Sequence, residues 1–249
     1  MPPRNPPCPC VLDDSLTSKA YGPGGDEVGC LSVASRCRIV GTTPAPTPRK
    51  GAPDEKDDPM SLAELLVTPL GWMLRGKRSK PERSVQFAQE LASPGILTVS
   101  SPAFDAGQAI PRRHSGIGRG PNISPELRWS GLPDGTRQLL LIVEDTDVPL
   151  DSPIIHLIAL LEPDSAHGVV EGALTPGNLA VHYVPAFRGW VAYQGPRPLP
   201  GHGAHHYGFH LYALDVELDV RGINGLPELL PKVEGHVLAS GSLVGTQRA

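Results

Sequence analysis

The sequence of 249 residues contains few aromatic side chains and little charge: Phe, Trp and Tyr make up 5% of it and charged residues 19%. The formal net charge is −4, so the chain lacks the excess of Lys and Arg with which proteins bind a nucleic-acid backbone. No run approaches the length of about 18 apolar residues that a membrane-spanning helix needs. We therefore expect neither a nucleic-acid partner nor a transmembrane segment.

Cysteine is scarce and confined to the first forty residues, at positions 8, 10, 30 and 37. The spacing of these residues matches no common zinc-ligand pattern, and a disulfide framework would require a secreted protein. The N-terminus shows neither the apolar region of a signal peptide nor the acid-poor composition of a transit peptide. We expect a reduced protein in the cytoplasm, with no metal and no cofactor.

Proline (29) and glycine (28) are abundant, and residues 1–59 show no apolar periodicity, so we expect a disordered N-terminal extension there. Residues 60–95 are expected to form a short helix and a linker. In "SLAELLVTPLGWML" the leucines recur at helical spacing after a capping box of Ser61 and Glu64, and Pro69 should kink or shorten the helix. Docking of this helix on the main domain is the favoured interpretation, and a partner-facing role is the alternative. The next stretch, "RGKRSKPERS", is typical of a solvated basic linker.

The main domain is expected to span residues 96–249. Continuous apolar runs at 138–144 and 154–161 are typical of strands buried on both faces, and strands are also expected from residue 96 and over 209–218. A late helix is expected over 226–239, although Pro231 interrupts it. Long helices do not alternate with these strands, so the pattern predicts an all-β fold, an antiparallel β-sandwich with one or two short peripheral helices.

Two stretches resemble a nucleotide-binding or a metal-binding motif but do not match it. "GWMLRGKR" (71–78) resembles a phosphate-binding loop, but Arg78 stands where a hydroxyl must bind Mg²⁺. The stretch "GPRPLPGHGAHHYGFHLYALD" (195–215) holds four histidines, at positions 202, 205, 206 and 210, whose spacing fits no common zinc site. A metal site is therefore not expected.

Several motifs in order carry a more specific signal: "NISPELRWSGLP", "DTDVP", "HLIALL", "GPRPLPGHGAHHY", "ALD" and "GHVLASGSLVG". From about residue 97 onward the chain resembles the phosphatidylethanolamine-binding protein family, also described as Raf-kinase-inhibitor-like proteins, and among them the bacterial-type members. The resemblance implies an antiparallel β-sandwich with a small surface cavity that takes phosphate-like anions. It implies that these residues bind the ligand: Asp145, Asp147, His156, Gly195, Pro196, His205 and Tyr207.

The chain departs from the family pattern at the mouth of this implied cavity. Thr146 and Val148 replace a proline and an alanine of the acidic turn, and Leu199 replaces a proline of the wall. His206 stands where arginine is common, which removes a fixed positive charge. On the resemblance, His202 and His206 belong to the loop or the rim. These differences bear on affinity and ligand identity more than on the fold.

The implied residues suit a phosphate monoester or a phospholipid head group. Imidazoles, a tyrosine hydroxyl and backbone N–H groups of the Gly-Pro turn donate to phosphate oxygens. Asp145 would orient His156 or meet the ammonium of ethanolamine. Taken singly, the acids could instead form an Asx-type turn, and His156 and Tyr207 could be packing residues.

Three functions follow from this site. The first is a non-catalytic binding protein that regulates a kinase or protease partner, as the resemblance implies. The second is a hydrolase or lyase in which His156 or His205 acts as the base near Asp145, although no attacking serine or cysteine is recognisable. The third is an interaction scaffold with a vestigial cavity. A homodimer stays open.

Overall fold

The computed structural model describes residues 62–163 and 168–249, and these residues belong to one compact unit. Residues 1–59, which the sequence analysis expects to be disordered, the four cysteines and Ser61 of the expected capping box lie outside the described residues.

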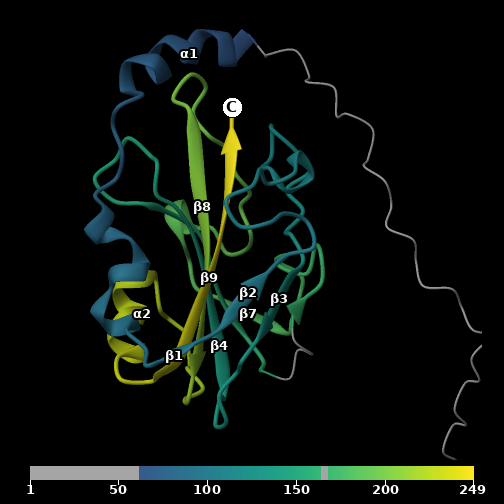
Figure 1. The fold of residues 1–249 in the computed structure, drawn as a ribbon, viewed down its shortest axis with the longest axis vertical. Helices are drawn as coiled ribbons and strands as arrows, with labels where there is room; N and C mark the ends of the chain where they lie inside the picture. The colour runs from purple at the N-terminus through teal and green to yellow at the C-terminus, as the bar shows by residue number, and fades with distance from the viewer. Residues whose placement is uncertain (1–61, 164–167) are drawn as a thin grey trace, which may run out of the picture. The chain divides into compact units, whose positions relative to one another are not determined.

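Two β-sheets form the body of the protein (Figure 1). All pairings within them are antiparallel except that between β1 and β9, which is parallel. The larger sheet has the order β1-β9-β8-β4-β5-β7: Gly95–Ile96, Val237–Arg248, Ala204–Leu214, Gln138–Asp145, Ile154–Leu161 and Val181–Tyr183. The smaller sheet has the order β2-β3-β6: Thr98–Ser100, Leu127–Ser130 and Gly168–Val169. With two α-helices in the described residues, the predicted β-sandwich is confirmed.

Strand β4 is buried on both faces, as its continuous apolar run predicts. Leu139 and Leu141 pack in a core that includes residues of the smaller sheet, whereas Leu140 and Ile142 pack in a second core with helix α2 (Leu226–Val233). Side chains alternate between the faces of a strand, so this one strand contributes to both cores. The molecule therefore has three layers, with the larger sheet in the middle.

Strand β8 and the late helix differ from their predicted bounds. Strand β8 begins at 204 rather than 209 and carries the histidine-rich stretch into the sheet. The helix predicted over 226–239 ends at Val233, although Pro231 lies within it. Gly235 follows with φ at +79°, a conformation that ends helices, and the chain then enters β9.

Helix α1 (Leu62–Leu74) lies across one end of the sandwich (Figure 1) and continues through Pro69 without a break. Its buried residue is Gly71, where a side chain would clash with the carbonyl of Pro200. The helix contacts the main domain through Glu64 and Gly71, but its leucines face outward and take no part in this docking. The helix fits the body through its small and polar residues.

The segment after α1 is not a solvated linker along its whole length. Ser79 and Ser84 are buried, and Val85 and Leu91 pack in the second core. Three short 3₁₀ turns carry this stretch along the larger sheet: Pro81–Arg83, Val85–Phe87 and Gln89–Leu91. Two further 3₁₀ turns lie in loops, Arg112–His114 and Phe187–Gly189.

Candidate functional site

Strand register brings three of the predicted site residues together. Asp145 ends β4 and pairs with Tyr207 of β8, and directly paired residues of antiparallel strands share a face. On β5, the register shifts opposite Val143 and Glu144, which leaves His156 as an extra residue in a bulge. The bulge turns His156 toward the same face, where its ring lies 5.4 Å from that of Tyr207.

An acid–histidine network, formed by Asp145, Asp147, His202, His205 and His206, surrounds this group. Oδ2 of Asp145 lies 2.8 Å from Nδ1 of His205, and its Oδ1 accepts the backbone N–H of Asp147 at 2.9 Å. The second bond is the Asx-type turn that turn statistics favour. The carboxylate of Asp145 therefore shapes the acidic turn and also binds an imidazole.

His202 links the segment after α1 to His205. Its Nε2 lies 3.0 Å from the carbonyl oxygen of Lys77 and 3.2 Å from Nη1 of Arg78, and its Nδ1 lies 2.9 Å from Nε2 of His205. Burial above all, then His205 and Arg78, lowers the pKa of His202. Nδ1 of His205 faces Oδ2 of Asp145, so the His205 ring bridges Asp145 and His202.

The role of His205 thus differs from the one that the resemblance implies. Both of its ring nitrogens are bonded within the protein, so it positions Asp145 and His202 instead of offering a free donor. His202 is fully buried and central to the network, not a residue of the rim. Only His206, half exposed, lies at the surface.

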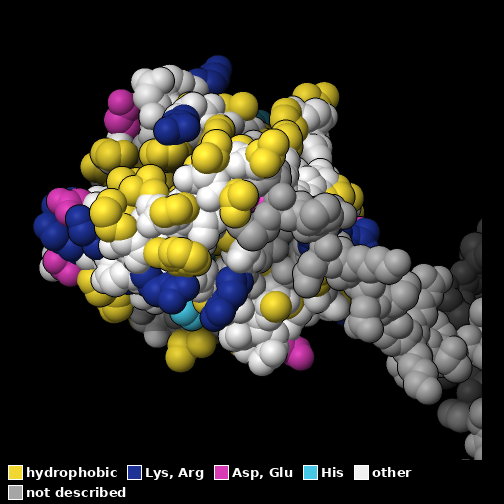
Figure 2. All heavy atoms as spheres, turned by 90° about the horizontal axis from the view of Figure 1, so that it is seen from above, with side chains coloured by type: hydrophobic (Ala, Val, Ile, Leu, Met, Phe, Trp, Pro, Cys, Tyr) yellow, Lys and Arg dark blue, Asp and Glu magenta, His cyan; other side chains and the backbone are white. Residues whose placement is uncertain are grey.

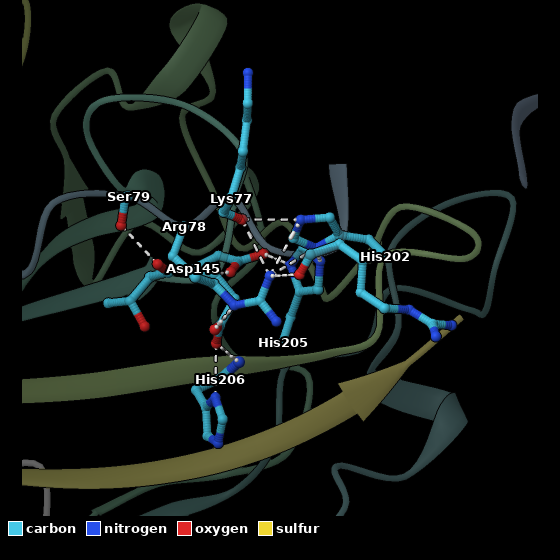
Figure 3. Close-up of polar contacts among 10 residues, drawn as sticks. Lys77, Arg78, Ser79, Asp145, His202, His205 and His206 are labelled. Carbon is cyan, nitrogen blue, oxygen red and sulfur yellow. Dashed lines mark hydrogen bonds and ion pairs between the residues drawn. The ribbon is translucent and has the colours of Figure 1, made fainter. Parts of the chain in front are cut away.

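Asp147 is bound by the chain from two directions. It accepts the backbone N–H of His206 at 2.7 Å and contacts Nδ1 of the same residue at 2.6 Å. From the segment after α1, Nε of Arg78 reaches its other oxygen at 2.6 Å, and the Arg78 side chain extends into the network (Figure 3). Arg78 therefore supplies a fixed positive charge beside His206, the position at which the family commonly has arginine.

His156 and Tyr207 each have one polar atom with no hydrogen-bond partner among the described residues. Nδ1 of His156 donates to the carbonyl of Gln194 at 2.7 Å, and Nε2 has no hydrogen-bond partner among the described residues. Burial lowers the pKa of His156, against an opposing effect of Asp145, so Nε2 is an acceptor near neutral pH. The buried Tyr207 hydroxyl likewise has no partner in the described part of the chain. Burial and nearby Asp145 raise its pKa, and a backbone group of Arg197 opposes them, but neither neighbour meets hydrogen-bonding geometry with the hydroxyl.

The Gly-Pro turn contributes shape rather than donors. Gly195 and Pro196 are buried, and the N–H of Gly195 already donates to Oδ1 of Asn122 at 2.8 Å. Proline has no N–H, so the expected free backbone donors are not found at these two residues. The carbonyl of His114 lies so close to Gly195 that no side chain would fit there.

Sequence reasoning missed Arg78 and His202. A basic linker gives no sign of which of its arginines turns inward, and the contact between Arg78 and Asp147 joins positions far apart in the chain. The described residues contain no group of three His, Cys, Asp or Glu side chains arranged to hold a metal ion.

Comparisons with known proteins agree on the family. Residues 100–248 match the family model described as phosphatidylethanolamine-binding protein. A UPF0098 protein of Methanothermobacter thermautotrophicus is 35% identical, over 61% of this chain and 99% of its own length, and one of Pyrococcus horikoshii is 36% identical, over 60% and 75%.

Solved structures agree as well. A putative phosphatidylethanolamine-binding protein homologue from Chlamydia trachomatis has a TM-score of 0.54 at 33% identity, and covers 62% of this chain and 99% of its own. Escherichia coli YbcL, at 22% identity and a TM-score of 0.57 over 62% of this chain and 99% of its own, shares the fold. Given the β-sandwich and the match over more than half of its length, the chain belongs to the phosphatidylethanolamine-binding protein family.

Proposed function

We propose that the chain is a non-catalytic binding protein whose acid–histidine network, with Arg78, His156 and Tyr207, takes a small phosphate-bearing molecule. Membership of the family supports a small-ligand binding protein in general terms. The finer proposal, a phosphate monoester or a phospholipid head group, rests on the chemistry of the described side chains.

The Tyr207 hydroxyl carries this proposal. A buried donor without a partner costs the folded protein about 1–3 kcal/mol, so its retention is best explained by a group that binds it. Two further groups could bind a ligand, Nε2 of His156 and the Nη2 amino group of Arg78. Neither group makes a hydrogen bond to a described residue. Together they offer donors to phosphate oxygens and one acceptor for an acidic P–OH or an ammonium group.

Two arginines bring positive charge to these groups. Arg78 forms an ion pair with Asp147, and the charge of Arg197 helps to lower the pKa of His156. These two charges balance the carboxylates of Asp145 and Asp147, so the site has no net negative charge that would repel an anion. With about three charge-assisted bonds and the usual entropy loss, we expect dissociation constants between about micromolar and millimolar.

A catalytic role in the same place is less well supported. Neither His156 nor His205 forms a hydrogen bond to a serine, threonine or cysteine of the described residues. The arrangement therefore lacks the nucleophile–base pair of covalent catalysis. A kinase or protease partner stays a prediction from the resemblance, because no contact among the described residues bears on it.

Calorimetric titration with inorganic phosphate and with phosphoethanolamine tests the proposal, using wild type, Arg78→Gln and Arg75→Gln. Arg75 lies in the same segment but hydrogen-bonds the carbonyl of Gly201, outside the network, so it controls for the lost charge. We expect saturable binding to wild type, a loss of about tenfold or more in Arg78→Gln and little change in Arg75→Gln.

Absence of saturable binding to wild type, or equal weakening by both substitutions, would overturn the site. Tighter binding of phosphoethanolamine than of phosphate would identify the head group as the better ligand. In that case the ammonium would meet Asp145 or Nε2 of His156.

A further inference from the structure

Helix α1 contacts the body of the protein through a stripe of polar and small residues. Glu64 forms an ion pair with Arg119 at 3.0 Å, Thr68 is half-buried, and Gly71 packs against the carbonyl of Pro200. Residues spaced by four and three positions lie on one side of a helix, so these three define the inner face of α1. The side of α1 that meets the protein is thus its least apolar side.

The outer face of α1 is apolar. Surface helices normally turn their apolar stripe inward, and a contiguous exposed apolar patch marks an interaction site. Figure 2 looks onto this end of the molecule and shows hydrophobic side chains gathered there, with Lys and Arg side chains around them. The apolar face of α1 consists of six side chains that are each 46–82% exposed: Leu62, Leu65, Leu66, Leu70, Trp72 and Met73.

Positive charge borders this apolar face at the C-terminal end of the helix. Residues 75–83 contain five basic side chains and one acidic one. Arg75 and Lys77 are exposed and contact no carboxylate among the described residues, and the Lys77 side chain extends away from the acid–histidine network (Figure 3). The one acid of α1, Glu64, faces inward toward Arg119, so it does not neutralise them.

We propose that the apolar face of α1 and the basic residues after it dock on the surface of an anionic phospholipid bilayer. A helix of 13 residues is about 20 Å long, shorter than the hydrocarbon core of about 30 Å, and none of the described helices is long and apolar enough to cross a membrane. Such a helix instead lies in the plane of the interface. Leucines enter the acyl region, Trp72 lies at head-group depth, and Arg75 and Lys77 meet anionic lipids.

Charge favours a lipid surface over a second copy of this chain. A copy docked face to face would present the same leucines and the same unpaired bases, and within residues 62–83 it offers only Glu82 as an exposed acid. An anionic bilayer supplies both an apolar layer and the opposite charge. The docking surface lies upstream of the matched family domain and does not depend on the proposed anion site.

Flotation with vesicles tests the proposal, with the full chain mixed with either phosphatidylcholine alone or phosphatidylcholine and phosphatidylserine. The double variant Leu66→Gln and Trp72→Gln removes apolar contact without a change in charge, and Arg75→Gln with Lys77→Gln removes charge alone. Leu179→Gln, at an exposed leucine away from α1, is the matched control. Flotation repeated with excess free phosphoethanolamine, which would fill the anion site, separates docking from that site.

We expect Leu179→Gln and wild type, with or without free phosphoethanolamine, to float with anionic vesicles, with weaker binding at high salt. The apolar double variant should lose about tenfold or more of its partitioning, and the charge variant about fivefold for each base removed. Failure of wild type to float, or equal loss in Leu179→Gln, would overturn docking by α1. A dimer that the apolar double variant dissociates, seen by light scattering without vesicle binding, would assign the face to a second copy and overturn it too.

Discussion

Replacing Tyr207 with phenylalanine is expected to stabilise the free protein and to weaken its binding of phosphate. The hydroxyl is buried and no described residue meets hydrogen-bonding geometry with it, although Asp145 and a backbone group of Arg197 lie near, so folding removes it from water with little compensation. Such a group costs about 1–3 kcal/mol, and its deletion leaves a ring of almost the same shape. A hydrogen bond from this hydroxyl to a bound anion contributes about 1.5–3 kcal/mol, so its loss should weaken binding by roughly 10- to 150-fold.

Tyr212→Phe is the matched control on the same strand. Tyr212 is buried on the opposite face of β8, where its hydroxyl donates to the carbonyl of Val85 at 3.5 Å. Its removal should lower the free energy of unfolding by no more than about 1 kcal/mol and leave phosphate affinity unchanged. Chemical denaturation and calorimetry measure the two quantities. If Tyr207→Phe lowers the free energy of unfolding as Tyr212→Phe does, or binds phosphate with the affinity of wild type, the Tyr207 hydroxyl does not bind the ligand.

Two further predictions concern acid and helix α1. Burial lowers the pKa of His114, His156 and His202 from 6.5, so below about pH 6.5 the unfolded chain binds protons that the folded chain does not. The free energy of unfolding should therefore fall on acidification, by at most about 1.4 kcal/mol per pH unit for each of the three. Denaturation between about pH 7 and pH 5 checks this, and unchanged stability would contradict it. Gly71→Ala should release α1, because its Cβ would lie 1.8 Å from the carbonyl oxygen of Pro200. Hydrogen exchange over 62–74 should then speed up, whereas Gly76→Ala, with nothing within 4 Å, should leave it unchanged.

The central strands are predictable from the sequence because burial on both faces leaves a local signature. The apolar runs at 138–144 and 154–161 became β4 and β5 almost residue for residue. Strand β9 has a weaker sequence signature, since Ser240, Gly241 and Ser242 have low strand propensity. Its pairing with β8 along most of its length decides its conformation, and sequence periodicity does not report that contact.

The site is predictable to the extent that adjacent strands create it. The pairing of Asp145 with Tyr207 follows once the motifs lie on neighbouring strands. The contribution of Arg78 is different, because it depends on a segment upstream of the matched domain folding back onto the acidic turn. Helix α1 shows the same limit. Leucines at helical spacing predict a helix, but they do not say whether the apolar face meets the protein or an external surface.

A chain shortened to residues 96–249, the boundary that the sequence predicts, is expected to fold with markedly lower stability. It loses Val85 and Leu91 from the second core and both hydrogen bonds from Ser84 and Val85 to Glu144, a carboxylate with no exposed surface. Each lost bond to a buried charge costs about 1.5–3 kcal/mol, and each large apolar side chain about as much again.

Ser84→Ala in the full chain measures the contribution of one of these interactions, the hydrogen bond from Ser84 to Glu144. It should lower the free energy of unfolding by about 1–3 kcal/mol, with Ser152→Ala, at an exposed loop position, as the control. His210 then remains at 3.2 Å from Glu144, without hydrogen-bonding geometry, so it compensates little. If the shortened chain equals the full chain in stability, the segment before residue 96 does not stabilise the domain. If the shortened chain is less stable, this segment completes the second core, and the domain extends upstream of residue 96.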